Sequence, residues 1–261
     1  MNAYEKVLSA RAADRAQGTF YISRIIDDFI ELHGDRSFGD DGAIVGGVGY
    51  LDKRPVTVIT MNRGDTLEER MKRNFGCPSP EGYRKALRLM KQAEKFGRPV
   101  ICFVGSPGAY CGITAEERGQ GEAIARNLWE MAALEIPILT VVTGEGGSGG
   151  ALALSVSDRM FMLEDAVYSV VSPEGCATIL WKDAGRAKEA AELLKLTSAD
   201  LLRLGVADAV LDEAGKSPEQ VAKELKKLLI SSLKDMDKIR ISVLLASRYQ
   251  RYRRIGGLWN G

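Results

Sequence analysis

Histidine is nearly absent from this chain, which has a single one, His33, among its 261 residues. Enzymes that transfer acyl groups through a side-chain nucleophile commonly rely on a histidine as general base. The scarcity therefore argues against a serine or cysteine nucleophile that is activated in this way. If the chain performs acyl chemistry, other groups are expected to carry it.

Cysteine is also scarce, and its spacing argues against metal sites and disulfides. The four cysteines are far apart and form no Cys-x-x-Cys pair: Cys77, Cys102, Cys111 and Cys176. Neither a zinc site nor a disulfide framework is therefore expected within the chain, and we predict no bound metal. Cys102 lies in an apolar run typical of a core strand, whereas Cys111 follows a Pro-Gly-Ala-Tyr turn.

Long apolar runs and an excess of one charge are missing as well. No run is long enough to cross a bilayer, and the first residues lack the hydrophobic core of a signal peptide. The 36 Lys and Arg residues nearly balance the 35 Asp and Glu residues, for a formal net charge of +1. These features predict a cytoplasmic protein with neither a membrane segment nor a nucleic-acid surface.

What the sequence has instead is a dense glycine segment between a strand and a helix. Residues 137–142 are β-branched and apolar, which predicts a buried strand, and residues 151–154 resemble the first turn of a helix. Five of the seven residues in 144–150 are glycine, more than a tight turn needs. A helix start presents unpaired N–H groups and partial positive charge. The segment therefore predicts a site for an oxyanion, or for a carbonyl oxygen that gains negative charge.

The same glycines match two other motifs. Residues 144–149 fit G-x-G-x-x-G, with Glu164 and Asp165 near the distance expected of a ribose-binding acid, which leaves a dinucleotide-binding protein of Rossmann type as an alternative. Residues 146–150 fit G-x-S-x-G with Ser148 as nucleophile, but no histidine follows it to complete a triad. No Gly-Lys-Ser/Thr follows the glycines, so a P-loop is excluded.

The rest of the chain predicts an α/β protein. Helices and strands alternate over 81–180, which predicts a parallel sheet with right-handed crossovers. Ligands of such sheets bind at the carboxyl ends of the strands, so segments 105–110 and 144–150 are expected to line one cleft. The expected helices are 1–33, 81–96, 116–134, 172–182, 186–204 and 217–235, and the expected strands are 43–51, 55–61, 99–104, 137–142, 159–163, 166–171 and 206–211. Strands 43–51 and 55–61 are predicted to form a hairpin with its turn at 52–54, and the polar, basic segment 63–80 is predicted to be an exposed loop. The buried stripe of the first helix is expected to consist of Ile22, Ile25, Ile26, Phe29 and Ile30. The basic, aromatic stretch 248–254 is interpreted as a partner-docking end.

Several long motifs resemble one protein family. They are 73–90 (RNFGCPSPEGYRKALRLM), 107–110 (PGAY), 115–120 (AEERGQ), 122–128 (EAIARNL), 144–153 (GEGGSGGALA) and 172–177 (SPEGCA). Together they resemble the carboxyltransferase α-subunit family of bacterial acetyl-CoA carboxylase. The resemblance runs from about Phe29 to the basic end of the chain.

This resemblance implies a fold and a function. The fold would be crotonase-like (ClpP/crotonase), a spiral of β-β-α units at 34–212, with helical extensions at 1–33 and 213–261 in a single domain. The function would be transfer of the carboxyl group from carboxybiotin to acetyl-CoA, giving malonyl-CoA for fatty-acid synthesis. In this family the carboxybiotin is presented by a biotin carboxyl carrier protein. A zinc-bearing β subunit joins the α subunit, and the assembly is expected to be an α2β2 heterotetramer.

The resemblance also implies site residues. Backbone N–H groups of Gly149 and Gly150 would form the oxyanion hole for the ureido oxygen of biotin. Residues that bind the substrate around them would be Gly108, Ala109, Tyr110, Gly146 and Gly147. No cofactor is expected to be bound covalently to this chain.

Overall fold

The structure is a computed structural model that describes residues 1–257. Over these residues, eight strands form one mixed sheet in the order β1-β2-β3-β4-β5-β6-β8, and β7 pairs with the end of β5. The strands are β1 (Asp27–Glu31), β2 (Ile44–Leu51), β3 (Arg54–Met61), β4 (Val100–Ser106), β5 (Ile138–Gly147), β6 (Arg159–Leu163), β7 (Val167–Ser169) and β8 (Ala209–Leu211). From β3 to β8 the neighbouring strands are parallel, as the alternation of elements predicts.

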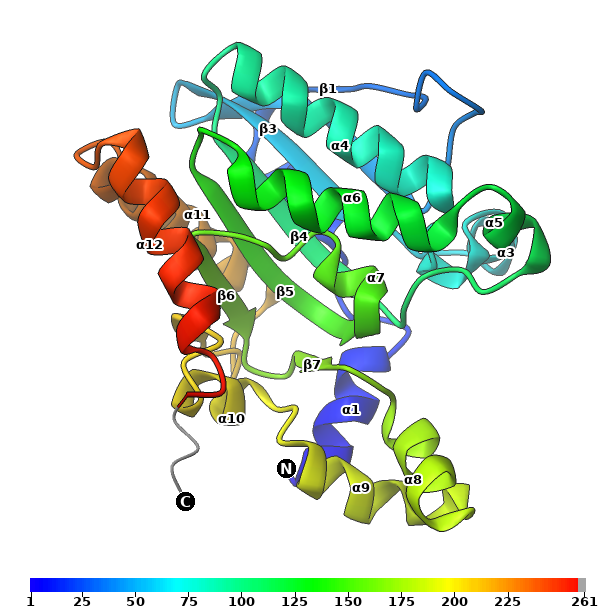
Figure 1. Cartoon of the computed structure of the whole chain (residues 1–261). Coiled ribbons are helices and arrows are strands. Elements are labelled where there is room, and N and C mark those ends of the chain that lie inside the picture. Colours follow the sequence, from blue (N-terminus) through cyan, green and yellow to red (C-terminus); the bar gives the residue numbers. More distant parts are fainter. Residues whose placement is uncertain (258–261) are drawn as a thin grey trace.

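Helices cover both faces of this sheet. They are α1 (Ala3–Arg11), α2 (Gly18–Ile25), α3 (Leu67–Lys72), the 3-10 helix η1 (Asn74–Gly76), α4 (Pro80–Lys95), α5 (Ile113–Glu117), α6 (Gln120–Ala133), α7 (Ser148–Leu152), α8 (Pro173–Trp181), the 3-10 helix η2 (Ala184–Arg186), α9 (Ala187–Leu194), α10 (Ser198–Arg203), α11 (Pro218–Met236) and α12 (Ile241–Arg254). Figure 1 shows α4, α6 and α7 over one face and α1, α8 and α9 grouped beyond the carboxyl end of β5.

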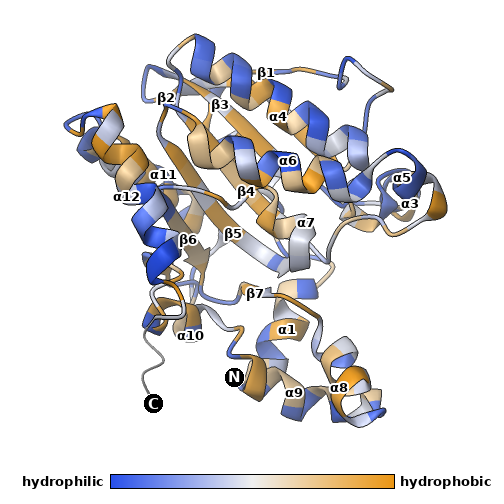
Figure 2. Cartoon of the chain, in the orientation of Figure 1, coloured by the Kyte–Doolittle hydropathy of each residue, from blue (hydrophilic) through white to orange (hydrophobic). Residues whose placement is uncertain are grey.

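The central strands are apolar because both of their faces are buried. In β4, Ile101 and Phe103 pack with α2 and α11, whereas Val100, Cys102 and Val104 pack with α4 and α6. Alternate residues of a strand point to opposite faces, so a strand covered on both sides reads as a continuous apolar run. Figure 2 shows this hydrophobic centre between more polar helix surfaces.

The predicted hairpin is confirmed. β2 and β3 pair antiparallel from Ile44–Met61 to Leu51–Arg54. The two turn residues, Asp52 and Lys53, both have positive φ angles, 49° and 67°. Positive φ angles at both residues are typical of the turn that joins two strands through a two-residue loop, because the twist of this turn matches the twist of the strands.

The prediction of one helix over 1–33 is wrong in its middle, where the non-helical residues 12–17 separate α1 from α2, and at its end. Helix α2 stops at Ile25, and residues 27–31 form the edge strand β1, which pairs with β2. Ile30, expected on the buried stripe, is 61% exposed. Residues 27–31 pair with the backbone of β2, which lies outside the local sequence that predicted a helix. This pairing outweighs the helical spacing of the apolar residues.

Two other predicted helices are each divided in two. The helix predicted over 116–134 breaks at Gly119, whose φ of 81° is left-handed, so α5 and α6 are separate. The helix predicted over 186–204 breaks at Lys195, with a φ of 51°, and Thr197 then caps α10 by accepting from the Asp200 N–H. Left-handed residues end a helix because the next peptide no longer continues its hydrogen bonds.

The C-terminal part is helical, as predicted, through α11 and α12. Residues 258–261 of the predicted segment 213–261 lie outside the described residues. The docking interpretation of 248–254 is wrong for Arg248, which is buried and forms an ion pair with Asp158, and for the Tyr252 hydroxyl, which hydrogen-bonds to Ser155 and Ser157 of the same chain. The assignment of 1–261 to a single domain stays a prediction.

Candidate functional site

The two glycine-bearing segments meet at one edge of the sheet, as predicted. β4 and β5 are parallel neighbours, and Ser106 at the end of β4 pairs with Gly146. A Cβ on Gly147 would lie 2.0 Å from the carbonyl oxygen of Pro107, so only glycine allows this approach. The Ser106 hydroxyl donates to the carbonyl of Gly108 and accepts from its N–H, which holds the turn after β4.

The segment 144–150 is not the loop that its glycine content suggests. Strand β5 continues to Gly147, because Glu145, Gly146 and Gly147 pair with β7. Helix α7 begins directly at Ser148, whose φ of 54° is left-handed. A strand-to-helix junction without a connecting loop turns the chain sharply, and it leaves the exposed Ser148 at the corner.

The start of α7 presents free backbone donors. The first N–H groups of a helix have no intrahelical acceptor, and Gly147 caps α7 without a side chain. Outside the helix, none of the described residues accepts a hydrogen bond from the N–H of Gly149 or Gly150. These donors and the positive end of the helix can hold a negative oxygen.

The two predicted oxyanion glycines differ in their surroundings. Gly150 is buried, and a Cβ there would lie 2.4 Å from the Ala109 nitrogen. A Cβ on Gly149 would meet only Ile124 Cγ2, at 3.8 Å. Gly149 therefore faces open space, whereas Gly150 fixes the segment after β4 against α7.

The structure brings only some of the predicted substrate-binding residues together. Gly108, Ala109 and Gly147 lie at the contact between the two segments. Gly146 is buried behind it, where a Cβ would meet the Tyr168 ring at 2.5 Å. The Tyr110 N–H donates to the carbonyl of Pro78, so its backbone is tied to the segment before α4.

A cavity of about 210 Å³ adjoins these strand ends, and its lining includes residues that the sequence did not single out. Four arginines border it, together with Ser106 and Gly144: Arg11, Arg15, Arg63 and Arg70. The segment 63–80 was predicted as an exposed loop, but it contains the helix α3 and the 3-10 helix η1. Its positive charge was the signal in the sequence for Arg63 and Arg70. Arg11 and Arg15 could not be assigned to this cavity from the sequence, because they lie near the N-terminus, far in sequence from the ends of β4 and β5.

Two of these arginines are neutralised by carboxylates. Arg11 pairs with Glu145 at 2.7 Å and with Glu174 at 2.9 Å, and Arg15 pairs with Glu213 at 2.9 Å. Arg63 instead donates to backbone carbonyls, including those of Arg11 and Ala12. Its Nε is buried without an acceptor among the described residues. Burial, and then the charge of Arg70, lower the pKa of the Arg63 guanidinium, as expected of a cation that lacks a carboxylate partner.

The structure does not support Ser148 as a nucleophile. Across residues 1–257, Ser148 Oγ forms no hydrogen bond, and His33 lies beside Asp40 and Glu31. A general base must lie within hydrogen-bond reach of the group it deprotonates. Also within this range, no group of three or more His, Cys, Asp or Glu side chains is placed to hold a metal ion.

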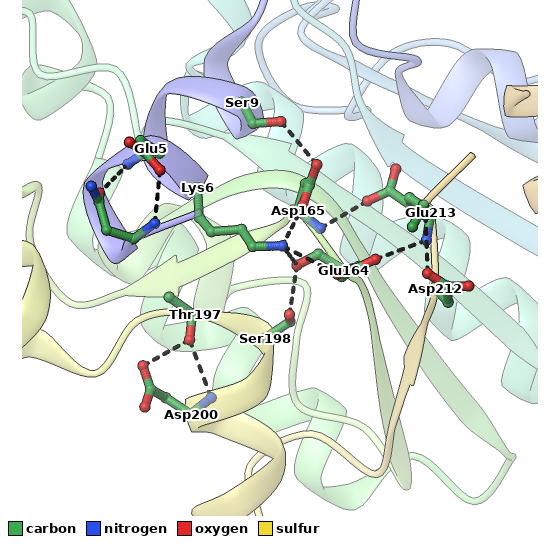
Figure 3. Close-up of polar contacts among 12 residues, drawn as sticks. Glu5, Lys6, Ser9, Glu164, Asp165, Thr197, Ser198, Asp200, Asp212 and Glu213 are labelled. Carbon is green, nitrogen blue, oxygen red and sulfur yellow. Dashed lines mark hydrogen bonds and ion pairs between the residues drawn. The ribbon is translucent and has the colours of Figure 1, made fainter. Parts of the chain in front are cut away.

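The dinucleotide-binding alternative is not supported. Figure 3 shows Lys6 of α1 between Glu164 and Asp165, the acids that would hold the ribose. Its Nζ lies 3.4 Å from Glu164 and 2.5 Å from Asp165. The Ser9 hydroxyl donates to Asp165, and the N–H of Glu213 donates to Glu164. Both carboxylates therefore tie α1 and the segment after β8 to the sheet.

None of the helices in the described part of the chain is both long and apolar enough to cross a membrane.

Comparison with known proteins gives consistent results. The family model "acetyl co-enzyme A carboxylase carboxyltransferase-like" matches residues 1–256. The acetyl-coenzyme A carboxylase carboxyl transferase subunit alpha of Clostridium perfringens (strain SM101) is 54% identical over 259 residues, which cover 98% of this chain and 96% of the relative. The protein of the same name from Streptococcus pneumoniae (strain Hungary19A-6) is 55% identical over 254 residues, 97% of this chain and 100% of the relative.

Solved structures share the fold at low sequence identity. A transcarboxylase 12S hexamer with hydrolysed methylmalonyl-coenzyme A matches 91% of this chain with a TM-score of 0.71 and 20% identity. The geranyl-CoA carboxylase β subunit of P. aeruginosa matches 95% of this chain with a TM-score of 0.67 and 17% identity. This chain covers 45% of each of those chains. The likeness confirms the predicted crotonase-like α/β fold.

Proposed function

This chain belongs to the acetyl-CoA carboxylase carboxyltransferase α-subunit family, and from that premise we propose how it works. It acts with a β subunit to transfer the carboxyl group of carboxybiotin to acetyl-CoA. The product, malonyl-CoA, is the substrate of fatty-acid synthesis. The observation that carries the proposal is the free start of α7, where Gly149 and Gly150 present N–H groups beside Ala109.

The backbone supplies the chemistry that this reaction needs. The carboxyl group leaves carboxybiotin as CO2 when its N–C bond breaks, and the methyl carbon of acetyl-CoA forms the new bond to CO2 after giving a proton to the ureido group. As the N–C bond breaks, its electron pair places negative charge on the ureido oxygen. The N–H groups of Gly149 and Gly150 hold this oxygen, aided by the positive end of the short α7. A fixed donor of this kind contributes about 2.7–4 kcal/mol to transition-state stabilisation in other enzymes. No general base is required at this oxygen, which accords with the single histidine.

The site fits a planar ligand with an oxygen at one end. The nearest neighbour of a Cβ placed on Gly149 is Ile124 Cγ2 at 3.8 Å, so a ring can approach the Gly149 N–H. The neighbouring cavity carries the unpartnered Nε of Arg63. A carboxylate entering this cavity would find a donor that has no acceptor among residues 1–257.

A partner subunit is proposed to cover the surface next to this site. Val170 is 76% exposed, Ile179 64% and Leu180 60%, an unusual concentration of large apolar side chains on α8 and the segment before it. A helix that is apolar on its outer face is normally buried by another element. Pro173 at the start of α8 shares a small cavity with Gly147 and Ser148. A subunit seated on α8 therefore reaches the oxyanion site, where it can bring acetyl-CoA.

The experiment is reconstitution. The purified chain should show negligible malonyl-CoA decarboxylation with biotin as acceptor until a zinc-bearing β chain is added, and activity should then appear at an α2β2 stoichiometry in light scattering. Addition of NAD should have no effect on turnover. Robust activity of the chain alone would contradict the proposal, as would stable NAD binding without any carboxyl transfer in the complex.

A further inference from the structure

Tyr83 carries a buried hydroxyl that nothing in the described residues explains. It is the fourth residue of α4, and its side chain has no exposed surface. Its hydroxyl has no hydrogen-bond partner across residues 1–257. A buried polar group without a partner loses its hydration and gains nothing in return.

The hydroxyl is aimed at the oxyanion site. A Cβ placed on Gly150 would lie 2.9 Å from Tyr83 Oη, 2.4 Å from the Ala109 nitrogen and 2.6 Å from the Gly108 carbonyl carbon. The phenol, the Gly108–Ala109 peptide and the start of α7 therefore converge on one point. Three segments that are far apart in the sequence meet there.

Phenylalanine would fill the same space without the orphan oxygen. The ring of Tyr83 belongs to the apolar core between α4 and the sheet, and that packing needs no hydroxyl. Burial raises the pKa of the Tyr83 phenol, so the group stays protonated and able to donate. The unfavourable burial of the Tyr83 hydroxyl is explained if this hydroxyl gains a hydrogen-bond partner in a state other than the free chain.

We infer that Tyr83 is a positioning residue of the carboxyltransferase site. When the site is loaded, its hydroxyl hydrogen-bonds to the Gly108–Ala109 peptide and sets the spacing between that peptide and the N–H groups of Gly149 and Gly150. The inference rests on the proposed function, because it assigns Tyr83 a role in that same site. The hydroxyl does not touch the substrate; it acts through the backbone on which the substrate rests.

Tyr83→Phe in the reconstituted complex with the β subunit tests the inference. The melting temperature should be unchanged or higher, because an unpartnered hydroxyl is removed. The kcat should fall by about tenfold or more, because fixed donors lose their geometry. The KM for free biotin should change little. A purely structural hydroxyl would not lower kcat while leaving stability intact.

Tyr252→Phe is the matched control. The Tyr252 hydroxyl accepts from the Ser157 N–H at 2.8 Å and donates to the Ser155 carbonyl at 2.9 Å. Removal of the same atom there should lower the melting temperature and leave kcat unchanged. The two variants together separate loss of stability from loss of positioning.

Each outcome decides the matter. Wild-type kcat in Tyr83→Phe overturns the inference while the proposed function stands. A fall in kcat accompanied by a melting temperature below that of Tyr252→Phe also overturns it, because the hydroxyl would then be structural. If the wild-type complex transfers no carboxyl group, the proposed function is wrong and the inference falls with it.

Discussion

Arg248 and Asp158 form a buried, bidentate ion pair. Arg248 Nε lies 2.9 Å from Asp158 Oδ1, and Nη2 lies 2.8 Å from Oδ2. The remaining guanidinium N–H groups donate to the carbonyls of Met131, Leu134 and Ile136, at the end of α6 and before β5. Arg248 is only 1% exposed. The Arg248 side chain of α12 therefore connects the end of α6, the segment before β5 and the segment before β6.

Loss of this guanidinium should destabilise the fold. Arg248→Met removes the charge and leaves Asp158 buried, with the N–H of Ile138 as its one remaining donor among residues 1–257. Removal of one partner of a buried pair costs about 3–5 kcal/mol. Urea unfolding should show a loss of this size. Arg253→Ala, at an exposed position of the same helix, should stay within about 0.5 kcal/mol of wild type, and equal stability of the two variants would refute the role of Arg248.

Gly149 and Gly150 should respond differently to a larger side chain. Gly149→Val should keep the melting temperature and lower the transfer rate by roughly a hundredfold, because the side chain crowds the oxygen that the N–H holds. Gly150→Val should lower both, with about 1–3 kcal/mol lost to overpacking against Ala109. Thermal unfolding and turnover of the assembled complex measure the two effects. A fully active Gly149→Val complex would exclude the proposed oxyanion hole.

Ser148 should be dispensable for chemistry. Ser148→Ala keeps the backbone donors and removes only an exposed hydroxyl that hydrogen-bonds to none of the described residues, so turnover should stay within about threefold of wild type. A nucleophile would behave otherwise, since its removal costs several orders of magnitude in kcat. A steady-state assay of the folded complex decides between the two.

An exposed leucine of α8 should matter for assembly alone. Leu180→Asp places a charge on the surface proposed for the β subunit, where it would be desolvated on binding. The isolated chain should unfold at the wild-type temperature, but the complex should dissociate at least tenfold more readily in analytical ultracentrifugation. Leu8→Asp introduces the same charge at an exposed site on α1 and should leave assembly unchanged. Normal assembly of Leu180→Asp would place the partner elsewhere.

Asp40 should make stability depend on acid pH. Partial burial opposes its ionisation, but hydrogen bonds from Lys85 and from the Gly34 N–H outweigh this and hold the pKa of Asp40 well below its usual range. A carboxyl whose pKa is lower in the folded state stabilises the fold above its unfolded pKa of about 4, and that contribution is lost as the pH falls below it.

Asp40→Asn should therefore be less stable than wild type at pH 7, where the buried Lys85 has lost its counter-charge. The difference should shrink as the pH falls from 4 towards 2. Denaturant titrations of both proteins at several pH values measure it, with Asp14→Asn as an exposed control. A difference that is the same at pH 7 and pH 3 would contradict the assignment.

Sequence reasoning succeeded where the signal was local. The apolar runs of β4 and β5 predicted buried strands, and the Asp52–Lys53 pair between two apolar runs predicted a hairpin. It failed where a distant partner decided the structure. Residues 27–31 have helical spacing but pair with β2, and residues 145–147 look like part of a glycine-rich loop but pair with β7.

The candidate site, too, could be predicted from the sequence only in part. The density of glycine at 144–150 was visible in the sequence, because only glycine tolerates the close approach of another backbone. The difference between Gly149 and Gly150 was not visible, since it depends on Ala109 lying against one and open space beside the other. The arginine-lined cavity was missed because Arg11 and Arg63 reach it from separate parts of the chain.

The sequence by itself determined the family, the α/β class and the position of the glycine-rich segment, because long motifs, apolar periodicity and glycine density are properties of neighbouring residues. Only the tertiary structure decided that Ser148 stands at a strand-to-helix corner, that Arg248 is an internal tie and that the Tyr83 hydroxyl is aimed at Gly150. Each of these depends on contacts between segments tens of residues or more apart. Such contacts arise from packing and from the need to pair buried polar groups, and no local pattern encodes them.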